Sequence, residues 1–191
     1  MISEIRSKFN PFLKAISKPF LKIDPNIISL LGFATSFLFF YGIVSGEYWI
    51  ALVSFFGNIL DALDGTVART TGKESKFGGF LDSTLDRLSD SVMFLSFGFA
   101  GLVNWELLSG VIIVSLMISY VRSRAELAAG DGSKLAIGII ERPERLLFLF
   151  ISTAIMTFWN FTFTAPLMWV LFALSLFTLV QRIIGAKKLL K

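Results

Sequence analysis

The sequence predicts an all-α, polytopic membrane protein with six transmembrane helices and an amino-terminal interfacial amphipathic helix. Of its 191 residues, 54% are hydrophobic and 21 are phenylalanine, a composition too apolar for an ordinary soluble domain. The apolar stretches approach the ~20 residues that a helix needs to cross a bilayer, and short polar turns separate them. The 18 lysines and arginines fall at the amino end, in or near alternate loops and at the carboxyl end, which predicts that both termini lie in the cytoplasm.

Residues 1–24 are predicted to form the interfacial helix. Apolar side chains such as Phe9 and Phe12 recur at helical spacing, and basic side chains such as Lys14 lie between them. A surface helix packed against protein would show the same pattern, so this alternative stays open. The rest of the chain, residues 25–191, is expected to form one six-helix membrane domain.

The predicted spans follow in order along that domain. Turn-forming residues such as Ser45-Gly46-Glu47 and Asn104-Trp105-Glu106 separate neighbouring spans. The spans are expected at residues 27–44, 48–68, 78–101, 107–129, 141–159 and 166–183. In this arrangement the multi-pass chain lies in the cell membrane, and its polar loops 69–77 and 130–140 face the cytoplasm.

The residue types that are missing narrow the chemistry. The sequence has no cysteine and no histidine. This excludes disulfides, thiolate catalysis, Ser-His-Asp or Cys-His machinery and the usual zinc sites. Any general acid–base catalysis must therefore use carboxylates, lysines or tyrosines.

Two pairs of aspartates are the strongest candidates for a functional site. Asp61 and Asp64 end the second predicted span, and Asp82 and Asp86 begin the third. Spacings of three and four residues place each pair on one helix face, and the short loop brings the pairs to the same side of the membrane. Carboxylates beside apolar spans are costly and usually functional. A solvated loop with ordinary helix caps would explain one aspartate but not two pairs. Oxygen ligands alone suit Mg²⁺, Mn²⁺ or Ca²⁺.

Small and basic residues accompany these pairs. Gly65, Ala68 and Gly78 leave room for a ligand near the backbone, and Arg69 can balance phosphate charge. Together with a metal they suit a nucleotide diphosphate, although close helix packing is an equally good reason for any single glycine. A second basic cluster predicts either a site for a phosphorylated substrate or a set of cytoplasmic anchor charges; it comprises Arg122, Arg124, Lys134, Arg142, Arg145 and Arg182.

The pattern Asp61-x2-Asp64-Gly65-x2-Ala68-Arg69-x8-Gly78-x3-Asp82-x3-Asp86 resembles the signature of the CDP-alcohol phosphotransferase family. The resemblance implies the same architecture of six spans and an amino-terminal interfacial helix, and a homodimer. It also implies that the protein transfers a substituted phosphate from a CDP-linked donor to an alcohol and releases CMP.

The resemblance assigns roles to the matching residues. Two Mg²⁺ ions, with Mn²⁺ as a possible substitute, would be held by Asp61, Asp64, Asp82 and Asp86. Asp86 would also be the catalytic base. The CDP site would comprise Asp61, Asp64, Gly65, Ala68, Arg69 and Gly78, joined by Ser29 from a weaker match at the first span.

A narrower resemblance concerns the acceptor. The stretches around Ser119 and Arg142 are similar to the inositol-phosphate pocket of phosphatidylinositol-phosphate synthases and their archaeal counterparts. The donor would then be a CDP-linked lipid with diacylglycerol or archaeol tails, and the acceptor would be inositol 1-phosphate. The residues implied to bind the acceptor phosphate are Ser119, Arg122, Arg124, Arg142 and Arg182.

Other functions remain open at this stage. The same fold could use CDP-inositol as donor, or glycerol 3-phosphate or serine as acceptor. A different class of function is a divalent-cation transporter or channel with the aspartates as its ion site. In every case membrane lipid is an expected partner and nucleic acid is not.

Overall fold

A computed structural model of the chain describes residues 16–130, 132, 134–135, 137–159 and 163–191; the side chains of Ile59, Asp61 and Ala62 lie outside this description. The described residues form helices and turns, with no strand among them, so the all-α class is confirmed. Most of the predicted interfacial helix lies outside the described residues. Its last part contains a short 3-10 helix, η1 (Lys18–Phe20).

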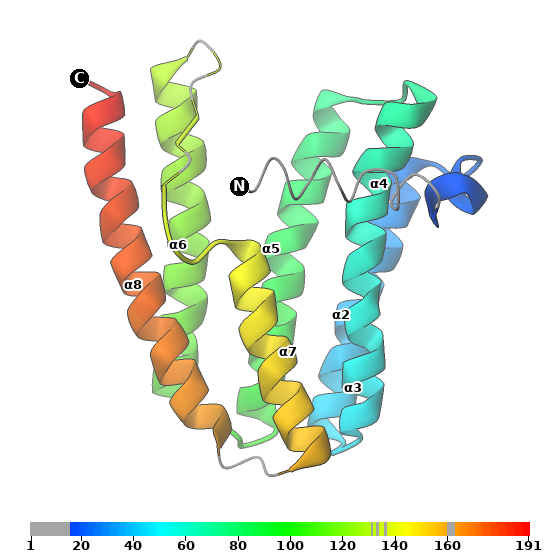
Figure 1. Cartoon of the computed structure of the whole chain (residues 1–191), viewed down its shortest axis with the longest axis vertical. Helices are drawn as coiled ribbons and strands as arrows, with labels where there is room; N and C mark the ends of the chain where they lie inside the picture. The colour runs from blue at the N-terminus through cyan, green and yellow to red at the C-terminus, as the bar shows by residue number, and fades with distance from the viewer. Residues whose placement is uncertain (1–15, 131, 133, 136, 160–162) are drawn as a thin grey trace.

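The remaining helices run roughly along the long axis of the molecule (Figure 1). Their starts follow from local capping: the side chains of Asp24, Ser75 and Asn104 each accept a backbone N–H from the first turn of the helix that follows. Their bounds are α2 (Pro25–Val44), α3 (Tyr48–Ser54), η2 (Phe55–Gly57), α4 (Asn58–Thr71), α5 (Lys76–Phe99), α6 (Trp105–Ala129), α7 (Arg142–Phe158) and α8 (Thr164–Leu189).

The second predicted span is not one continuous helix. A 3-10 turn, η2, separates α3 from α4. At this turn Gly57 lies against α2, where a Cβ atom would come within 2.0 Å of Thr35 Oγ1. Such close contact between backbone and a neighbouring helix accounts for the local change of winding. The sequence pattern missed it because the apolar run continues through the turn.

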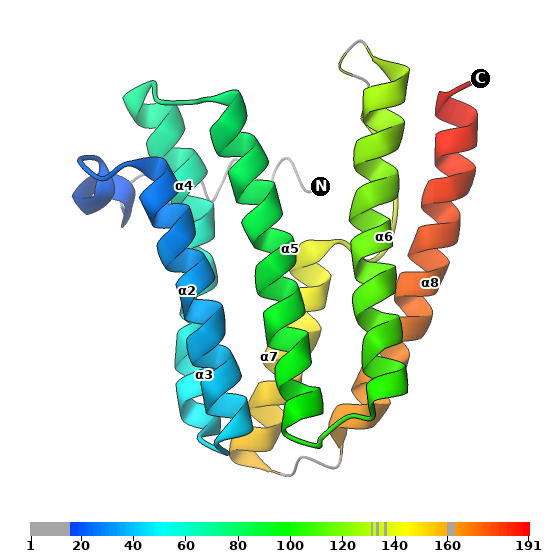
Figure 2. The same ribbon diagram turned by 180° about the vertical axis from the view of Figure 1, so that it is seen from behind.

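The helices pack in two groups that α7 connects (Figures 1 and 2). In the first group α2 contacts α3, α4 and α5, and in the second α6 lies along α8. Helix α7 contacts both α3 and α8. The core between them is apolar and combines phenylalanine with aliphatic side chains; its fully buried side chains include Phe39, Phe94, Phe97, Leu108, Leu149 and Leu171.

The position of α7 decides where the charged residues meet. After α6 the chain returns along that helix, and α7 begins near the middle of the molecule rather than at its end (Figure 1). Two hydrogen bonds tie this returning segment to α8: Thr178 Oγ1 accepts from Ile140 N–H at 3.0 Å, and Arg182 Nε donates to Ile137 O at 2.8 Å. The first turn of α7 therefore lies beside the middle of α5.

Within the described residues three helices are long and apolar enough to cross a membrane: α2, α6 and α8. Many of their apolar side chains are exposed, for example Phe37 on α2 and Phe177 on α8. Exposing such apolar surfaces to water would be unfavourable, whereas the lipid of a membrane would solvate them. Helix α5 carries several charged side chains and α7 has 17 residues, so composition and length alone do not identify them as spans.

We expect Gly42→Ala to destabilise the bundle, because a Cβ atom there would lie 2.5 Å from the backbone nitrogen of Ala51. Backbone atoms cannot move aside without separating α2 from α3, so the cost should be about 1–3 kcal/mol. The apparent melting temperature in detergent measures it. Gly79→Ala is the matched control, since its Cβ would meet open space. Equal melting temperatures for the two variants would contradict the close contact.

Candidate functional site

A cavity of about 240 Å³ lies between the start of α2, the end of α4 and the start of α5. Six of the seven residues predicted for the CDP site line it: Ser29, Asp64, Gly65, Ala68, Arg69 and Gly78. The seventh, Asp61, belongs to α4, and its side chain lies outside the described residues. The N-cap residues Asp24 and Ser75 also contribute to the lining, which the sequence analysis did not indicate. Pro25 and Asn26, which begin α2 and belong to the stretch of the weaker match that includes Ser29, line the cavity as well.

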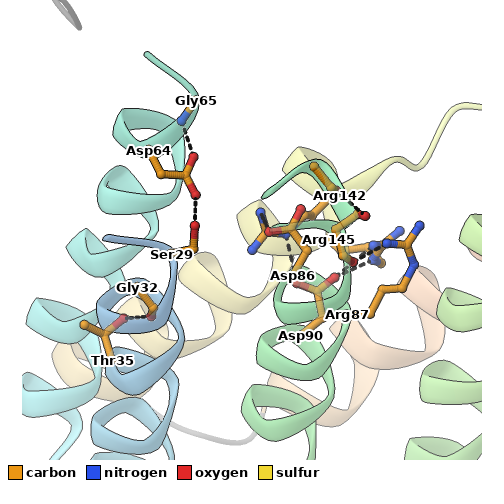
Figure 3. Close-up of polar contacts among 12 residues, drawn as sticks. Ser29, Gly32, Thr35, Asp64, Gly65, Asp86, Arg87, Asp90, Arg142 and Arg145 are labelled. Carbon is orange, nitrogen blue, oxygen red and sulfur yellow. Dashed lines mark hydrogen bonds and ion pairs between the residues drawn. The ribbon is translucent and has the colours of Figure 1, made fainter. Parts of the chain in front are cut away.

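Asp64 is the most buried acidic side chain in this cavity, with 5% of its surface exposed. Its carboxylate accepts hydrogen bonds from the Ser29 hydroxyl and from the backbone N–H of Gly65 (Figure 3). Asp82 lines the same cavity from the facing helix α5. The structure thus brings one aspartate from each predicted pair to a common space.

Gly65 leaves space for the Arg69 side chain. A Cβ atom at position 65 would lie 3.4 Å from Arg69 Nη1. The guanidinium therefore lies against the backbone one turn before its own position and remains on the cavity wall. A Cβ atom at position 65 would be in ordinary van der Waals contact with this guanidinium, so the glycine places a cation suited to a phosphate group close to the backbone.

A second, larger cavity of about 580 Å³ opens on the other side of α5. Four of the five residues predicted to bind the acceptor line it: Ser119, Arg122, Arg142 and Arg182. Arg124 is exposed and is not part of this lining. The reason is helical geometry, because residues two apart on α6 project in different directions.

Helix α5 separates the two cavities. Gly78 and Asp82 lie on the first cavity, whereas Asp86 and Asp90 line the second. Figure 3 shows Asp64 with Ser29 on one side and Asp86 with Arg142 on the other. Although Asp82 and Asp86 were expected to act from one face, their carboxylates line different cavities. Asp86 therefore lies on the second cavity, one helical turn from Asp82 on the first.

Asp86 contacts the first turn of α7. Arg142 Nη1 lies 2.6 Å from Asp86 Oδ1, and both side chains are largely but not fully buried. Among the described residues no three acidic side chains gather closely enough to hold a metal ion together. Since Asp61 is outside that set, the predicted four-carboxylate cluster stays a prediction.

Asp90 and Arg145 form a buried ion pair below this contact. Asp90 is 4% exposed and Arg145 is 3% exposed. Arg145 Nη2 donates to Asp90 Oδ2 at 2.8 Å, and Arg142 Nε donates to Asp90 Oδ1 at 3.3 Å. Sequence reasoning did not assign Asp90 to the site. The signal was present, because the four-residue spacing from Asp82 to Asp86 continues to Asp90.

Arg182 is held on several sides. Its side chain is 3% exposed and donates to Ile118 O, to Ile137 O and to Glu141 Oε1, each at 2.8 Å. Glu141 also lies 3.6 Å from Arg122 Nη1. Glu141, which contacts both Arg182 and Arg122, was not predicted as a site residue. In the sequence it resembles an ordinary charged residue at the end of a helix.

Comparison with known proteins agrees with this geometry. The model of the CDP-alcohol phosphatidyltransferase family matches residues 22–181. The chain belongs to this family. It is therefore a transferase, and the cation-transporter alternative is set aside. The residues of both cavities that were predicted from the motif lie within the matched region except Arg182, which follows it by one residue.

Two relatives illustrate the similarity. An archaetidylinositol phosphate synthase of Pyrococcus horikoshii is 42% identical over 194 residues, covering 100% of this chain and 99% of the relative. A phosphatidylinositol phosphate synthase of Mycolicibacterium smegmatis is 33% identical, covering 93% of this chain and 85% of the relative.

The fold is similar to solved structures of Mycobacterium tuberculosis phosphatidylinositol phosphate synthase. The structure with CDP-DAG bound superposes with a TM-score of 0.79 at 26% identity, covering 91% of this chain and 92% of that one. The structure with manganese and citrate gives a TM-score of 0.77 at 27% identity, covering 92% and 88% of the two chains.

Proposed function

We propose that this protein is an integral membrane phosphotransferase of phospholipid biosynthesis. It moves the phosphatidyl-type phosphate of a CDP-linked lipid to inositol 1-phosphate and releases CMP. The observation that carries this proposal is the pair of cavities that share helix α5, with Asp82 on the first and Asp86 on the second. Figure 3 shows Asp64 beside Ser29 and, apart from them, Asp86 beside Arg142. The names of the relatives support the same donor and acceptor.

The first cavity suits the CDP group of the donor. Arg69 provides a cation for the pyrophosphate, and Gly65 and Gly78 let phosphate oxygens approach the backbone. We assign Ser29 to hold the Asp64 carboxylate in place through its hydrogen bond. Lipid tails stay in the bilayer, because moving them into water is unfavourable. They would enter sideways between helices.

The carboxylates fit a hard divalent metal. Asp64 and Asp82 share a cavity and supply only oxygen ligands, and the sequence has no histidine or cysteine to favour softer metals. We assign two Mg²⁺ or Mn²⁺ ions to Asp61, Asp64, Asp82 and Asp86. The solved relative with manganese supports this choice. When bound, the ions would neutralise charge on the pyrophosphate and the leaving CMP.

The second cavity suits a phosphorylated acceptor. Arg122, Arg142 and Arg182 offer guanidinium groups that recognise phosphate, and Ser119 adds a hydroxyl. An acceptor without a phosphate, such as serine, would have little use for so many arginines. Arg124 lies outside this lining, so we assign it at most a peripheral contact with the acceptor.

The transfer proceeds by in-line displacement. The acceptor hydroxyl oxygen attacks the β-phosphorus that carries the lipid, and the bond between that phosphorus and the bridging oxygen of CMP breaks. Asp86 takes the hydroxyl proton, since it borders the acceptor cavity one turn from Asp82 on the donor side. Arg142 orients the acceptor phosphate, which fixes the hydroxyl relative to the donor.

The membrane arrangement follows from the same assignment. We propose six spans in one domain, residues 25–191, with residues 1–24 as an interfacial helix. The first cavity is lined by the end of α4 and the start of α5, and the second by the start of α7 and by residues near the carboxyl ends of α6 and α8. The α4–α5 loop and the carboxyl terminus lie at the same end of the molecule (Figure 1). Lysines and arginines concentrate there, so this end faces the cytoplasm and its soluble acceptor. As in the family resemblance, we expect the protein to work as a homodimer.

The decisive experiment measures CMP release by the purified protein in detergent with Mg²⁺. CDP-diacylglycerol, CDP-archaeol and CDP-inositol are offered as donors, each with inositol 1-phosphate or glycerol 3-phosphate. We expect a CDP-lipid together with inositol 1-phosphate to be the productive pair. Turnover only with CDP-inositol as donor, or only with glycerol 3-phosphate as acceptor, would refute the proposed substrates.

Asp86→Asn should abolish CMP release, because the amide keeps the shape of the side chain but cannot accept the proton. We expect kcat to fall at least about a hundredfold, in line with the usual contribution of a general base. Glu106→Gln makes the same chemical change at the far end of α6 and should retain full activity. Normal turnover by Asp86→Asn would defeat the mechanism.

Arg142→Ala should mainly weaken binding of the acceptor. Losing a charged contact to phosphate predicts a rise of about tenfold or more in the KM for inositol 1-phosphate, with the KM for the CDP-lipid little changed. Lys188→Ala removes an exposed cation outside the cavity and serves as control. We expect Arg124→Ala to have a smaller effect than Arg142→Ala. A larger rise in the donor KM than in the acceptor KM would contradict the assignment of the two cavities.

Removing divalent metal should stop the reaction reversibly. We expect chelation with EDTA to eliminate CMP release, and added Mg²⁺ or Mn²⁺ to restore it. Asp64→Asn should raise the metal concentration needed for half-maximal activity, because one oxygen ligand is lost. Undiminished activity after chelation and dialysis would exclude the proposed metal site.

A further inference from the structure

We propose that Asp90 is a positioning residue for the acceptor phosphate and acts through Arg142. The inference rests on the proposed function, in which the second cavity holds a phosphorylated acceptor. No part of the sequence signature includes Asp90. Its role follows from its contacts with two arginines of α7.

Asp90 holds a different arginine with each carboxylate oxygen (Figure 3). Its Oδ1 accepts from Arg142 Nε at 3.3 Å. Its Oδ2 accepts from Arg145 Nε at 3.2 Å and from Arg145 Nη2 at 2.8 Å. The carboxylate is 4% exposed, so solvent does not weaken these contacts appreciably.

These contacts determine the direction of the Arg142 guanidinium. The group is planar, so a bond at its Nε edge restricts the plane in which its two outer nitrogens can lie. With Nε bound to Asp90, Arg142 Nη1 reaches Asp86 at 2.6 Å, and the residue lines the acceptor cavity. Asp90 thereby places a phosphate-binding cation beside the proposed base.

The balance of charges in the cavity also indicates that its acidic residues position the arginines, and that the cavity does more than attract an anion. Five arginines and four acidic residues line this cavity, so most of the positive charge is neutralised locally. A site built only to attract an anion would not need so many carboxylates. Arg122 repeats the arrangement, because its Nε donates to Glu126 at 3.0 Å. In both Arg142 and Arg122 an acidic side chain therefore accepts a hydrogen bond from the Nε edge of the guanidinium.

A purely structural role predicts a different outcome. Buried ion pairs add little net stability and can often be replaced by apolar side chains without loss. If Asp90 served only to neutralise Arg145, removing both charges would restore both the stability of the protein and its binding of the acceptor. If it also positions Arg142, acceptor binding would stay impaired after stability is recovered.

The test compares Asp90→Asn with the double variant Asp90→Asn/Arg145→Met in steady-state CMP release. For Asp90→Asn we expect the KM for inositol 1-phosphate to rise about tenfold, with kcat and the KM for the CDP-lipid within about threefold of the parent values. In the double variant the apparent melting temperature should return towards that of the parent, while the acceptor KM stays raised. This variant keeps the test valid if the single substitution folds poorly.

Ser89→Ala is the matched control, since Ser89 neighbours Asp90, is buried and lines neither of the two cavities described above. It should leave both KM values unchanged. An acceptor KM within twofold of the parent in the double variant would overturn the proposal, as would parallel changes in donor and acceptor KM. If the parent protein uses glycerol 3-phosphate and not inositol 1-phosphate, the proposed acceptor is wrong. The Asp90 comparison then proceeds with glycerol 3-phosphate.

Discussion

The contact between the carboxylates of α5 and the arginines of α7 is the interaction on which the site depends. A charge inside an apolar helix bundle is costly unless a partner of opposite sign lies against it. Asp86 and Asp90 meet this condition with Arg142 and Arg145. The pairing explains why α7 begins at mid-height beside α5, and it orients the side chains that face the second cavity.

Helix α5 contributes carboxylates to both cavities. Residues spaced by four along one helix gradually turn around its axis, so successive carboxylates can line adjacent spaces. Asp82 lines the first cavity, whereas Asp86 and Asp90 line the second. In the proposed reaction the lipid-linked donor would occupy the first cavity and the soluble acceptor the second. This arrangement suits a direct transfer between the two substrates, without a separate carrier.

Fixed arginines also suit an acceptor that arrives from water. An arginine side chain loses much conformational freedom when it binds a phosphate, and that cost weakens binding. Glu126, Glu141 and Asp90 hold Arg122, Arg182 and Arg142 before any acceptor is present. Preorganisation of this kind raises affinity without additional contacts to the substrate. The acidic residues of the cavity would thus hold the arginines in place, a role that their negative charge alone would not suggest.

The sequence by itself determined the all-helical class and the family, and most of the residues that it predicted for the two cavities do line them, because the aspartate–glycine–arginine spacing reflects local helix geometry. Only the tertiary structure decided that α3 and α4 are separated at Gly57, that Arg124 lies outside the acceptor cavity and that Asp90 contacts Arg142. The break at Gly57 and the contacts of Asp90 depend on residues far apart in the chain, Gly57 with Thr35 and Asp90 with α7. For Arg124, the packing of α6 decided which of its faces borders the cavity. Periodicity within one helix carries no information about which neighbour its side chains will meet.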